Sequence, residues 1–331
     1  MKTKIMICTL ALVFSAFTGS AWGATETASY TYFGLNAGAS NTGLYNTFIG
    51  HQAGYSNTAG LGNVFIGEDA GYSNVLGGNY NEFIGYQAGY SNTDGLSNIF
   101  IGYAAGYFNT NSDYNIYIGS HTGYYSTGDE NTMVGVYAGY QNTTGSYNNF
   151  FGRNAGRNNT TGHNNNFSGY KTGWSNTAGS YNTFVGNQAG YNNTTASGNN
   201  FNGYNAGFSN TTGASNTFSG YGAGYANTTA SYNTFNGYQA GYSNTVGERN
   251  TFEGTSAGWA NTAGNYNTFF GYATGYKTTT GSNNLYLGNF AGYENLTGIG
   301  NVFLGYNAGR NETGSGKLYI ANSSTATPLI Y

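Results

Sequence analysis

The sequence is poor in cysteine, proline and charge. Its single cysteine is Cys8 and its single proline is Pro328. One thiol cannot form an intramolecular disulfide, so the fold is not a disulfide scaffold. Only 6% of the residues are charged, and the formal net charge is −3. A chain of this composition offers no basic surface to nucleic acid or to an anionic membrane.

Long apolar runs are scarce as well. Residues 5–17 form one such run, which follows Lys2 and Lys4 and leads into small residues up to Gly23. This is the layout of a secretory signal peptide, and the run is too short to span a bilayer. We therefore expect residues 1–23 to be a signal peptide, with cleavage after Gly23 or after Ala21. The exported chain would be secreted, extracellular or held at the cell surface, without a membrane span. Cleavage would also leave seven basic against twelve acidic residues, a net charge of −5.

Glycine and aromatic residues are abundant instead, with 56 Gly, 34 Tyr and 21 Phe. Much glycine is typical of disorder, whereas 18% aromatic residues indicates packed rings. An internal repeat decides between these interpretations, because a short fixed period is typical of a repeat architecture. Units of about 17 residues begin at Asn46, Asn63, Asn81, Asn98, Asn115, Asn131, Asn148, Asn165, Asn182, Asn199, Asn216, Asn233, Asn250, Asn267, Asn284 and Asn301.

The repeat array extends over residues 46–316. Residues 24–45, with "YTYFGLNAG", and residues 317–331, with "KLYIANS", are degenerate copies that flank it. We expect one continuous array and no second domain.

Within a unit the consensus is N-T-F-h-G-Y-x-A-G-Y-x-N-T-T-G-x-Y, numbered here as positions 1 to 17. Glycine occupies positions 5 and 9 in every unit, which indicates sharp corners or close backbone approach. Two extended runs between such corners predict an all-β parallel solenoid or β-roll of about sixteen coils, each with two short strands. Coils stacked at about 4.8 Å would give a rod of about 75 Å. The Asn residues at positions 1 and 12 would form amide ladders.

Position 3 is the large position that stays apolar in every unit, so it should face inward. Tyr117, Met133 and Tyr286 occupy it in three units. In the other units the predicted core residues are Phe48, Phe65, Phe83, Phe100, Phe150, Phe167, Phe184, Phe201, Phe218, Phe235, Phe252, Phe269 and Phe303.

Position 4 is apolar near both ends of the array and polar in the middle, where Asn202 and Ser219 occur. A position that accepts polar residues should point outward, opposite position 3. Apolar stripes would then be exposed at both ends unless a partner covers them. A fully buried position 4 is the alternative. The candidate subunit-contact residues are Ile49, Ile66, Ile84, Ile101, Ile118, Phe270, Leu287 and Leu304.

Aromatic residues recur at positions 10 and 6. At position 10, where Arg157 and Arg310 interrupt the row, they either close the coil edge by packing or stay exposed for a ligand. Tyrosine offers a large contact area at low entropic cost, so exposed rows can stack on sugars or on a neighbouring subunit. The candidate ligand or partner contacts at position 6 are Tyr86, Tyr103, Tyr170, Tyr204, Tyr221, Tyr238, Tyr272 and Tyr306.

No catalytic or metal-binding pattern accompanies the repeat. The histidines His51, His121 and His163 are scattered, and the adjacent acid pairs 68–69 and 129–130 lie in separate units. The loops carry Asn rather than the repeated Asp of calcium-binding β-rolls. We therefore expect no enzyme activity, no cofactor and no metal.

Units such as "NTFNGYQAGYSNTVG", residues 233–247, resemble the repeats of bacterial and phage tail-fibre-like surface proteins that precede an endosialidase-type chaperone domain. The segment "NVFLGYNAGRNETGSGKLYIANSSTATPLIY" resembles the part that closes such arrays. More distantly, N-T-F-I-G-x-x-A-G is similar to the head repeats of YadA-like trimeric autotransporter adhesins, which form a left-handed parallel β-roll. These resemblances imply an extracellular fibrous or adhesive role.

The sequence thus predicts a secreted structural protein whose partner is itself. Rung-on-rung stacking would build a homo-oligomeric or head-to-tail fibre with an adhesive role. The alternative is a carbohydrate-binding adhesin or tail-fibre-like module that binds surface glycans and does not polymerise.

Overall fold

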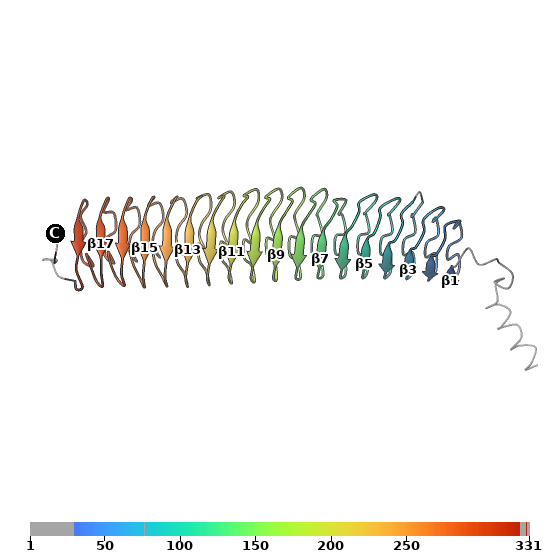
Figure 1. Cartoon of the computed structure of the whole chain (residues 1–331), viewed down its shortest axis with the longest axis horizontal. Coiled ribbons are helices and arrows are strands. Elements are labelled where there is room, and N and C mark those ends of the chain that lie inside the picture. The colour runs from blue at the N-terminus through green and yellow to red at the C-terminus, as the bar shows by residue number, and fades with distance from the viewer. Residues whose placement is uncertain (1–29, 76, 325–328, 330–331) are drawn as a thin grey trace, which may run out of the picture.

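The computed structural model describes residues 30–75, 77–324 and 329, which form a rod of stacked coils (Figure 1). Eighteen parallel strands of three residues each follow one another along the rod in chain order. The strands are β1 (Thr31–Phe33), β2 (Thr47–Ile49), β3 (Val64–Ile66), β4 (Glu82–Ile84), β5 (Ile99–Ile101), β6 (Ile116–Ile118), β7 (Thr132–Val134), β8 (Asn149–Phe151), β9 (Asn166–Ser168), β10 (Thr183–Val185), β11 (Asn200–Asn202), β12 (Thr217–Ser219), β13 (Thr234–Asn236), β14 (Thr251–Glu253), β15 (Thr268–Phe270), β16 (Leu285–Leu287), β17 (Val302–Leu304) and β18 (Leu318–Ile320).

Each strand pairs with the next one in the sequence, and equal positions of neighbouring coils face each other. Phe184 of β10, for example, lies opposite Phe167 of β9 and Phe201 of β11. Eighteen strands spaced about 4.8 Å apart make a sheet about 80 Å long. The all-β parallel solenoid predicted from the repeat is therefore confirmed.

The prediction of two strands per coil is wrong, because each described coil contains one. After the strand, the backbone turns at every second residue. In the second coil Gly50, Gln52 and Gly54 have φ values of 138°, 54° and 60°. No extended run fits between such closely spaced turns. The turning side still joins the coils, since the backbone N–H of Gly54 donates to the Ala70 carbonyl oxygen at 2.9 Å.

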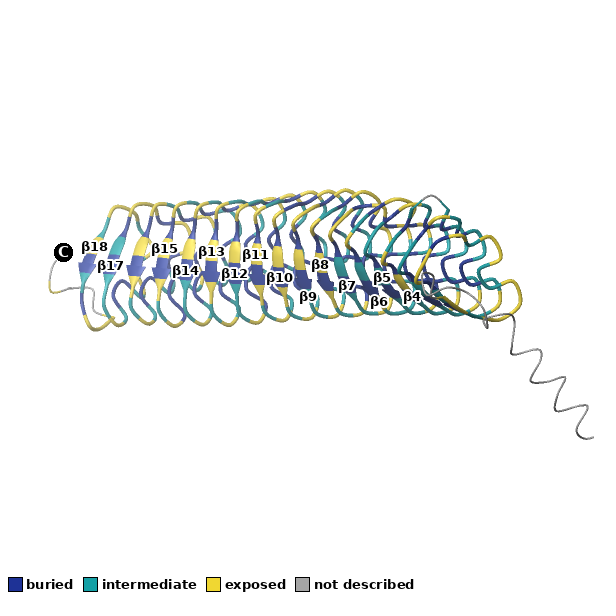
Figure 2. Cartoon of the chain, turned by 45° about the vertical axis from the view of Figure 1, so that its right-hand side comes forward, coloured by how far each residue is buried: buried dark blue, intermediate teal, exposed yellow. Residues whose placement is uncertain are grey.

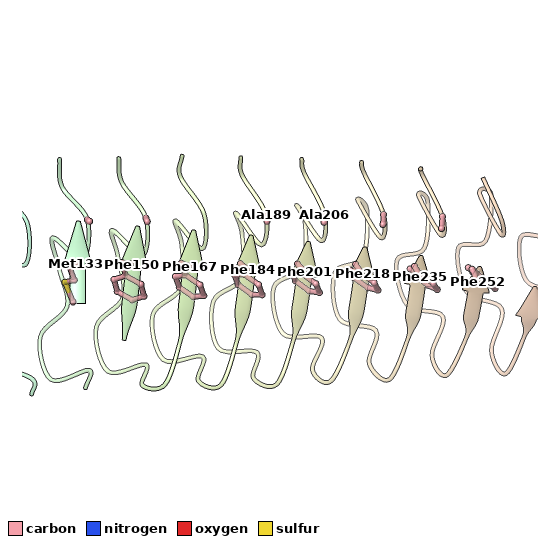
Figure 3. Packing of buried hydrophobic residues seen from close by; sticks show 14 of the residues in the cluster. Met133, Phe150, Phe167, Phe184, Ala189, Phe201, Ala206, Phe218, Phe235 and Phe252 are labelled. Carbon is pink, nitrogen blue, oxygen red and sulfur yellow. The ribbon is translucent and has the colours of Figure 1, made fainter. Parts of the chain in front are cut away.

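The core is a column of stacked rings along the inside of the sheet (Figure 3). Every Phe predicted for the core at position 3 is fully buried, so this prediction is confirmed. Neighbouring rings stack face to face, as Phe184 and Phe201 do with their centroids 4.8 Å apart. Met133 replaces a ring in one coil and fills the gap with a flexible side chain. Small residues such as Ala189 line the opposite wall of the core.

The glycines at positions 5 and 9 leave room for neighbouring atoms. A Cβ at Gly50 would overlap the carbonyl oxygen of Gly67 in the next coil. A Cβ at Gly54 would overlap the ring of Phe48 in its own coil. Both glycines also have positive φ values, which other residues adopt at a cost. The expected corners and close approaches are therefore present.

Two ladders of buried asparagines hold the polar side of the coil together. At position 12, Asn176 Nδ2 donates to Asn159 Oδ1 at 2.6 Å and to the Gly179 carbonyl oxygen at 2.9 Å. At position 1, the backbone N–H of Asn182 donates to Asn165 Oδ1 at 3.0 Å. These amides are buried, so each bond avoids an unsatisfied polar group. The predicted ladders therefore form, although at position 1 the rung-to-rung donor is mainly the backbone.

The stacking continues into both flanking segments. Residues 30–45 form the coil that contains β1, and β18 follows Lys317. The expected signal peptide, residues 1–23, lies outside the described residues. Within the part of the chain that is described, no helix is long and apolar enough to cross a membrane.

Candidate functional site

The outer face of the sheet is built from positions 2 and 4 of each coil. In β10, Thr183 and Val185 point outward on either side of the buried Phe184. The same alternation runs along the rod, where buried strand centres lie between more exposed strand ends (Figure 2). Position 4 is therefore outward in every coil, as expected, and the fully buried alternative is wrong.

All eight candidate subunit-contact residues lie on this outer face. Ile118, Phe270 and Leu287 are 37%, 54% and 46% exposed. The other members are half-buried, because apolar neighbours on adjacent strands cover part of each side chain. These half-buried residues are Ile49, Ile66, Ile84, Ile101 and Leu304.

Position 2 adds apolar residues that reasoning from position 4 alone missed. Positions 2 and 4 flank the buried position 3, so their side chains lie on the same outer face of the strand. This placement could have been predicted from the two-residue alternation of strand side chains. The N-terminal apolar patch consists of Val64, Ile66, Ile84, Ile99, Ile101, Ile116 and Ile118 on β3–β6. The C-terminal apolar patch consists of Phe270, Leu285, Leu287, Val302, Leu304, Leu318 and Ile320 on β15–β18.

Between the two patches the outer face is mostly polar. From β9 to β14 it carries Asn, Thr, Ser and Glu, with Val185 as the exception. Asn236 Nδ2 donates to Glu253 Oε1 at 2.6 Å across two neighbouring strands. One face of the rod therefore has two apolar ends and a hydrophilic middle.

The position 6 tyrosines lie directly after the Gly corner that ends each strand. All eight are between 40% and 55% exposed. Some of them stack, as Tyr204, Tyr221 and Tyr238 do with centroid distances of 5.1 and 5.2 Å. Tyr86 and Tyr103 form a second stack, whereas Tyr170, Tyr272 and Tyr306 stand in coils without a position 6 ring on either side.

The position 10 residues form a half-buried column that closes the coil. Tyr124 and Tyr140 stack at 5.3 Å, and the next member is Arg157. The Arg157 guanidinium lies 5.3 Å from the Tyr140 ring centroid and 4.9 Å from that of Trp174. A planar cation between two rings continues the stack, which explains why an arginine is tolerated there. Burial also raises the pKa of Tyr124 and Tyr140 above the ordinary tyrosine value.

A further row of tyrosines, not identified from the sequence, occupies the last position of every second coil between residues 45 and 181. These side chains directly precede the Asn that opens the next coil, and they are between 51% and 63% exposed. A tyrosine at every second unit, 33 to 35 residues apart, was the signal in the sequence. We call this set the alternate-coil tyrosine row: Tyr45, Tyr80, Tyr114, Tyr147 and Tyr181.

Among the described residues, titratable side chains do not gather into a reactive site. Burial lowers the pKa of His121, which packs among tyrosine rings, with those of Tyr103 and Tyr137 4.9 and 5.1 Å away. His51 Nδ1 lies 3.7 Å from Glu68 Oε1, and both side chains are exposed. The acid pairs 68–69 and 129–130 are separated by three coils, or about 14 Å along the rod, beyond the span of a glycosidase carboxylate pair. The described residues hold no group of three His, Cys, Asp or Glu side chains placed to bind a metal.

Comparison with known proteins returned no match to a family model, to a curated protein or to a solved structure. The indications of a function therefore come from the exposed surfaces of the rod.

Proposed function

We propose that this protein is an exported structural protein whose copies assemble into an extracellular fibre with an adhesive surface. The observation that carries this proposal is the pair of apolar patches at the two ends of one sheet face. Phe270, Leu285, Leu287 and Leu318 are each more than 40% exposed. They lie on β15, β16 and β18, and Val302 and Leu304 of β17 continue the apolar surface between them. Contiguous apolar surface of this kind marks an interaction site in a soluble protein.

The occupant that fits these patches best is a second copy of the chain. Each patch is a set of ladders with the spacing of parallel strands, about 4.8 Å, and another array presents ladders of the same spacing. The C-terminal patch carries no charged side chain, so two C-terminal patches can pack face to face without charge repulsion. The N-terminal patch contains one exposed charged side chain, Glu82 of β4, between Val64 and Ile99. Two sheets packed in this way interdigitate their side chains across about 10 Å.

Two patches on one rod allow assembly to continue. If C-terminal patches pair with each other and N-terminal patches pair with each other, each rod overlaps a neighbour at both ends. Each contact is two-fold, yet a chain of such contacts grows without limit. The polar middle of the face, from β9 to β14, then stays in water. The resemblance of the repeats to those of tail-fibre-like surface proteins also supports a fibrous role.

Sedimentation velocity of the full mature chain tests this assembly. We expect wild-type protein to sediment as a concentration-dependent series of oligomers. The double substitution Leu285→Ser and Leu287→Ser should stop growth at pairs of folded rods joined through their N-terminal patches, because it removes two exposed apolar side chains from the centre of the C-terminal patch. Val185→Ser is the matched control, since this residue is 38% exposed on the same face but outside both patches. Equal association of all three proteins would contradict the proposal.

The second candidate function is that of a non-polymerising, carbohydrate-binding adhesin. Exposure of the position 6 tyrosines, from 40% at Tyr86 to 55% at Tyr306, favours it. Wild-type protein that sediments as single rods at all concentrations would favour this function over fibre assembly.

A further inference from the structure

We propose that the alternate-coil tyrosine row binds an extended β-1,4-linked polysaccharide along the rod. This surface differs from the position 6 row, and the inference does not depend on fibre assembly. It rests on three observations: the backbone conformation of these tyrosines, their spacing and the residues between them.

The first observation is that these tyrosines occupy a strained backbone position. Tyr45, Tyr80, Tyr114, Tyr147 and Tyr181 have φ values between 57° and 61°. The left-handed region is unfavourable for a residue with a Cβ, and Gly or Asn adopts it most readily. Other coils do use these residues at the last position, as Gly62 and Asn164 show.

Burial of the ring does not offset this strain. The five side chains are at least half exposed, and no two described rings of the row stack on each other. Tyr181 makes an edge contact with the His163 ring, with the centroids 5.1 Å apart. The position 10 rings, by contrast, are half-buried and form a continuous stack. Folding requires a positive φ at this position in every coil, but it does not require a tyrosine there, and an unfavourable residue that folding does not require is typical of a residue kept for a function.

The second observation is the spacing of the row. Tyrosines in alternate coils recur every two rungs, or about 10 Å. One of these tyrosines, Tyr80, leans over the preceding coil. A Cβ at Gly62 would lie 2.8 Å from the Tyr80 ring. The last position of the intervening coils holds no ring, so the tyrosines stay apart and exposed.

A β-1,4-linked hexose chain has a matching period. Each sugar is turned over relative to the one before it, so the same apolar ring face recurs once per disaccharide. The length of that disaccharide is close to two rungs of the sheet. A straight rod with a tyrosine every two rungs can therefore place one ring under each disaccharide. A helical α-linked glucan does not keep this straight repeat.

The third observation is the chemistry between the rings. Ser97, Glu130 and Asn164 occupy the last position of three of the four intervening coils, where Ser and Asn provide donors and acceptors and Glu provides acceptors. Gly62 occupies the fourth. Sugar hydroxyls need such partners once water is displaced. Apolar platforms that alternate with hydrogen-bonding side chains fit the two kinds of surface that a sugar chain presents.

The row ends where its period changes. After Tyr181 the next two coils carry Gly198 and Ser215, and the following tyrosines hold a cation between them. The Arg249 guanidinium lies 5.1 Å from the Tyr232 centroid and 5.6 Å from that of Tyr266. We therefore limit the proposed site to the five tyrosines of the row.

Retention of the full mature chain on microcrystalline cellulose, with granular starch as the α-linked comparison, tests the proposal. We expect retention on cellulose and about tenfold weaker retention on starch. The row variant carries Asn in place of Tyr80, Tyr114, Tyr147 and Tyr181, and it should lose at least about tenfold in affinity for cellulose. Asn occupies the same position in other coils, so this variant should fold, and its thermal unfolding serves as the check.

The matched control carries Asn in place of Tyr232 and Tyr266, which occupy the same position of the coil with positive φ and are 58% and 55% exposed, but lie outside the row. It should bind cellulose as the wild type does. Both variants are also prepared in the Leu285→Ser and Leu287→Ser background, so that loss of binding is separated from loss of assembly. Wild-type protein that prefers starch, a row variant that binds cellulose fully, or a control variant that loses binding equally would each overturn the proposal.

Soluble β-1,4-linked glucose oligomers provide a second readout. Their affinity should rise with each added disaccharide up to the length of the row, because each one reaches a further tyrosine. An affinity that stops rising at the disaccharide would contradict a row-wide site.

Discussion

Positions 3 and 4 are neighbours on every strand, yet they vary in opposite ways along the rod. Position 3 holds Phe, Tyr or Met and is buried throughout the sixteen units, from Phe48 to Phe303. Position 4 changes from Ile49 through Asn202 to Leu304 and always points outward. The inside of each coil must match the insides of both neighbours, because rings and amides stack directly on their copies. Folding places no such demand on the outside, so variation there reflects what the surface contacts.

The largest loss of stability should follow from substituting a glycine at the position 5 corner. Gly186→Ala is expected to destabilise the chain by about 4 kcal/mol or more, because the new Cβ would overlap the carbonyl oxygen of Gly203. The control is Gly198→Ala, which also has positive φ but whose nearest atom is 3.6 Å away. It should lose only about 1 kcal/mol. Urea denaturation of the two variants measures the difference, and similar midpoints would contradict the steric explanation.

A smaller but still large loss of stability should follow from removing one ring of the core. We expect Phe184→Ala to lower the free energy of unfolding by about 3–5 kcal/mol, because it leaves a cavity between two stacked rings. Its neighbour Val185 points outward, so Val185→Ala should change that free energy by less than about 1 kcal/mol. Thermal and denaturant unfolding compare the two. A cost at Val185 equal to that at Phe184 would refute the assignment of inside and outside.

The smallest change in the free energy of unfolding should be a stabilisation. Tyr147→Asn is expected to raise the free energy of unfolding by about 1 kcal/mol, because asparagine fits the left-handed backbone better than tyrosine. Tyr140→Asn should instead destabilise the chain, since Tyr140 is half-buried and stacks with Tyr124. Differential scanning calorimetry distinguishes the two signs. Destabilisation by Tyr147→Asn would show that folding itself requires the exposed tyrosine.

Much of the inside could be predicted from the sequence, since stacking makes each position repeat. A buried Phe at position 3 and glycine corners at positions 5 and 9 were visible as constant columns. The number of strands was not, because the positive φ at position 7 is adopted by residues as different as Gln52, Asp69 and Ala104. No residue type marks that turn. The extended run predicted there is therefore a series of turns.

The outer surface was only partly predictable, for a related reason. The outward direction of position 4 followed from its polar members, and the structure confirms it. The contribution of position 2 to the same face was missed, although it follows from the two-residue alternation around Phe184. The alternate-coil tyrosine row was missed because its period is two units, and averaging over single units hides it. A surface that serves a partner can follow the dimensions of that partner rather than those of the repeat.

Electron microscopy of the purified mature chain tests most directly whether copies join through the apolar ends. The proposed assembly predicts long fibres in which rods of about 80 Å overlap at both ends and leave their polar middles uncovered. Discrete single rods, or closed pairs that overlap along their full length and do not grow, would contradict it.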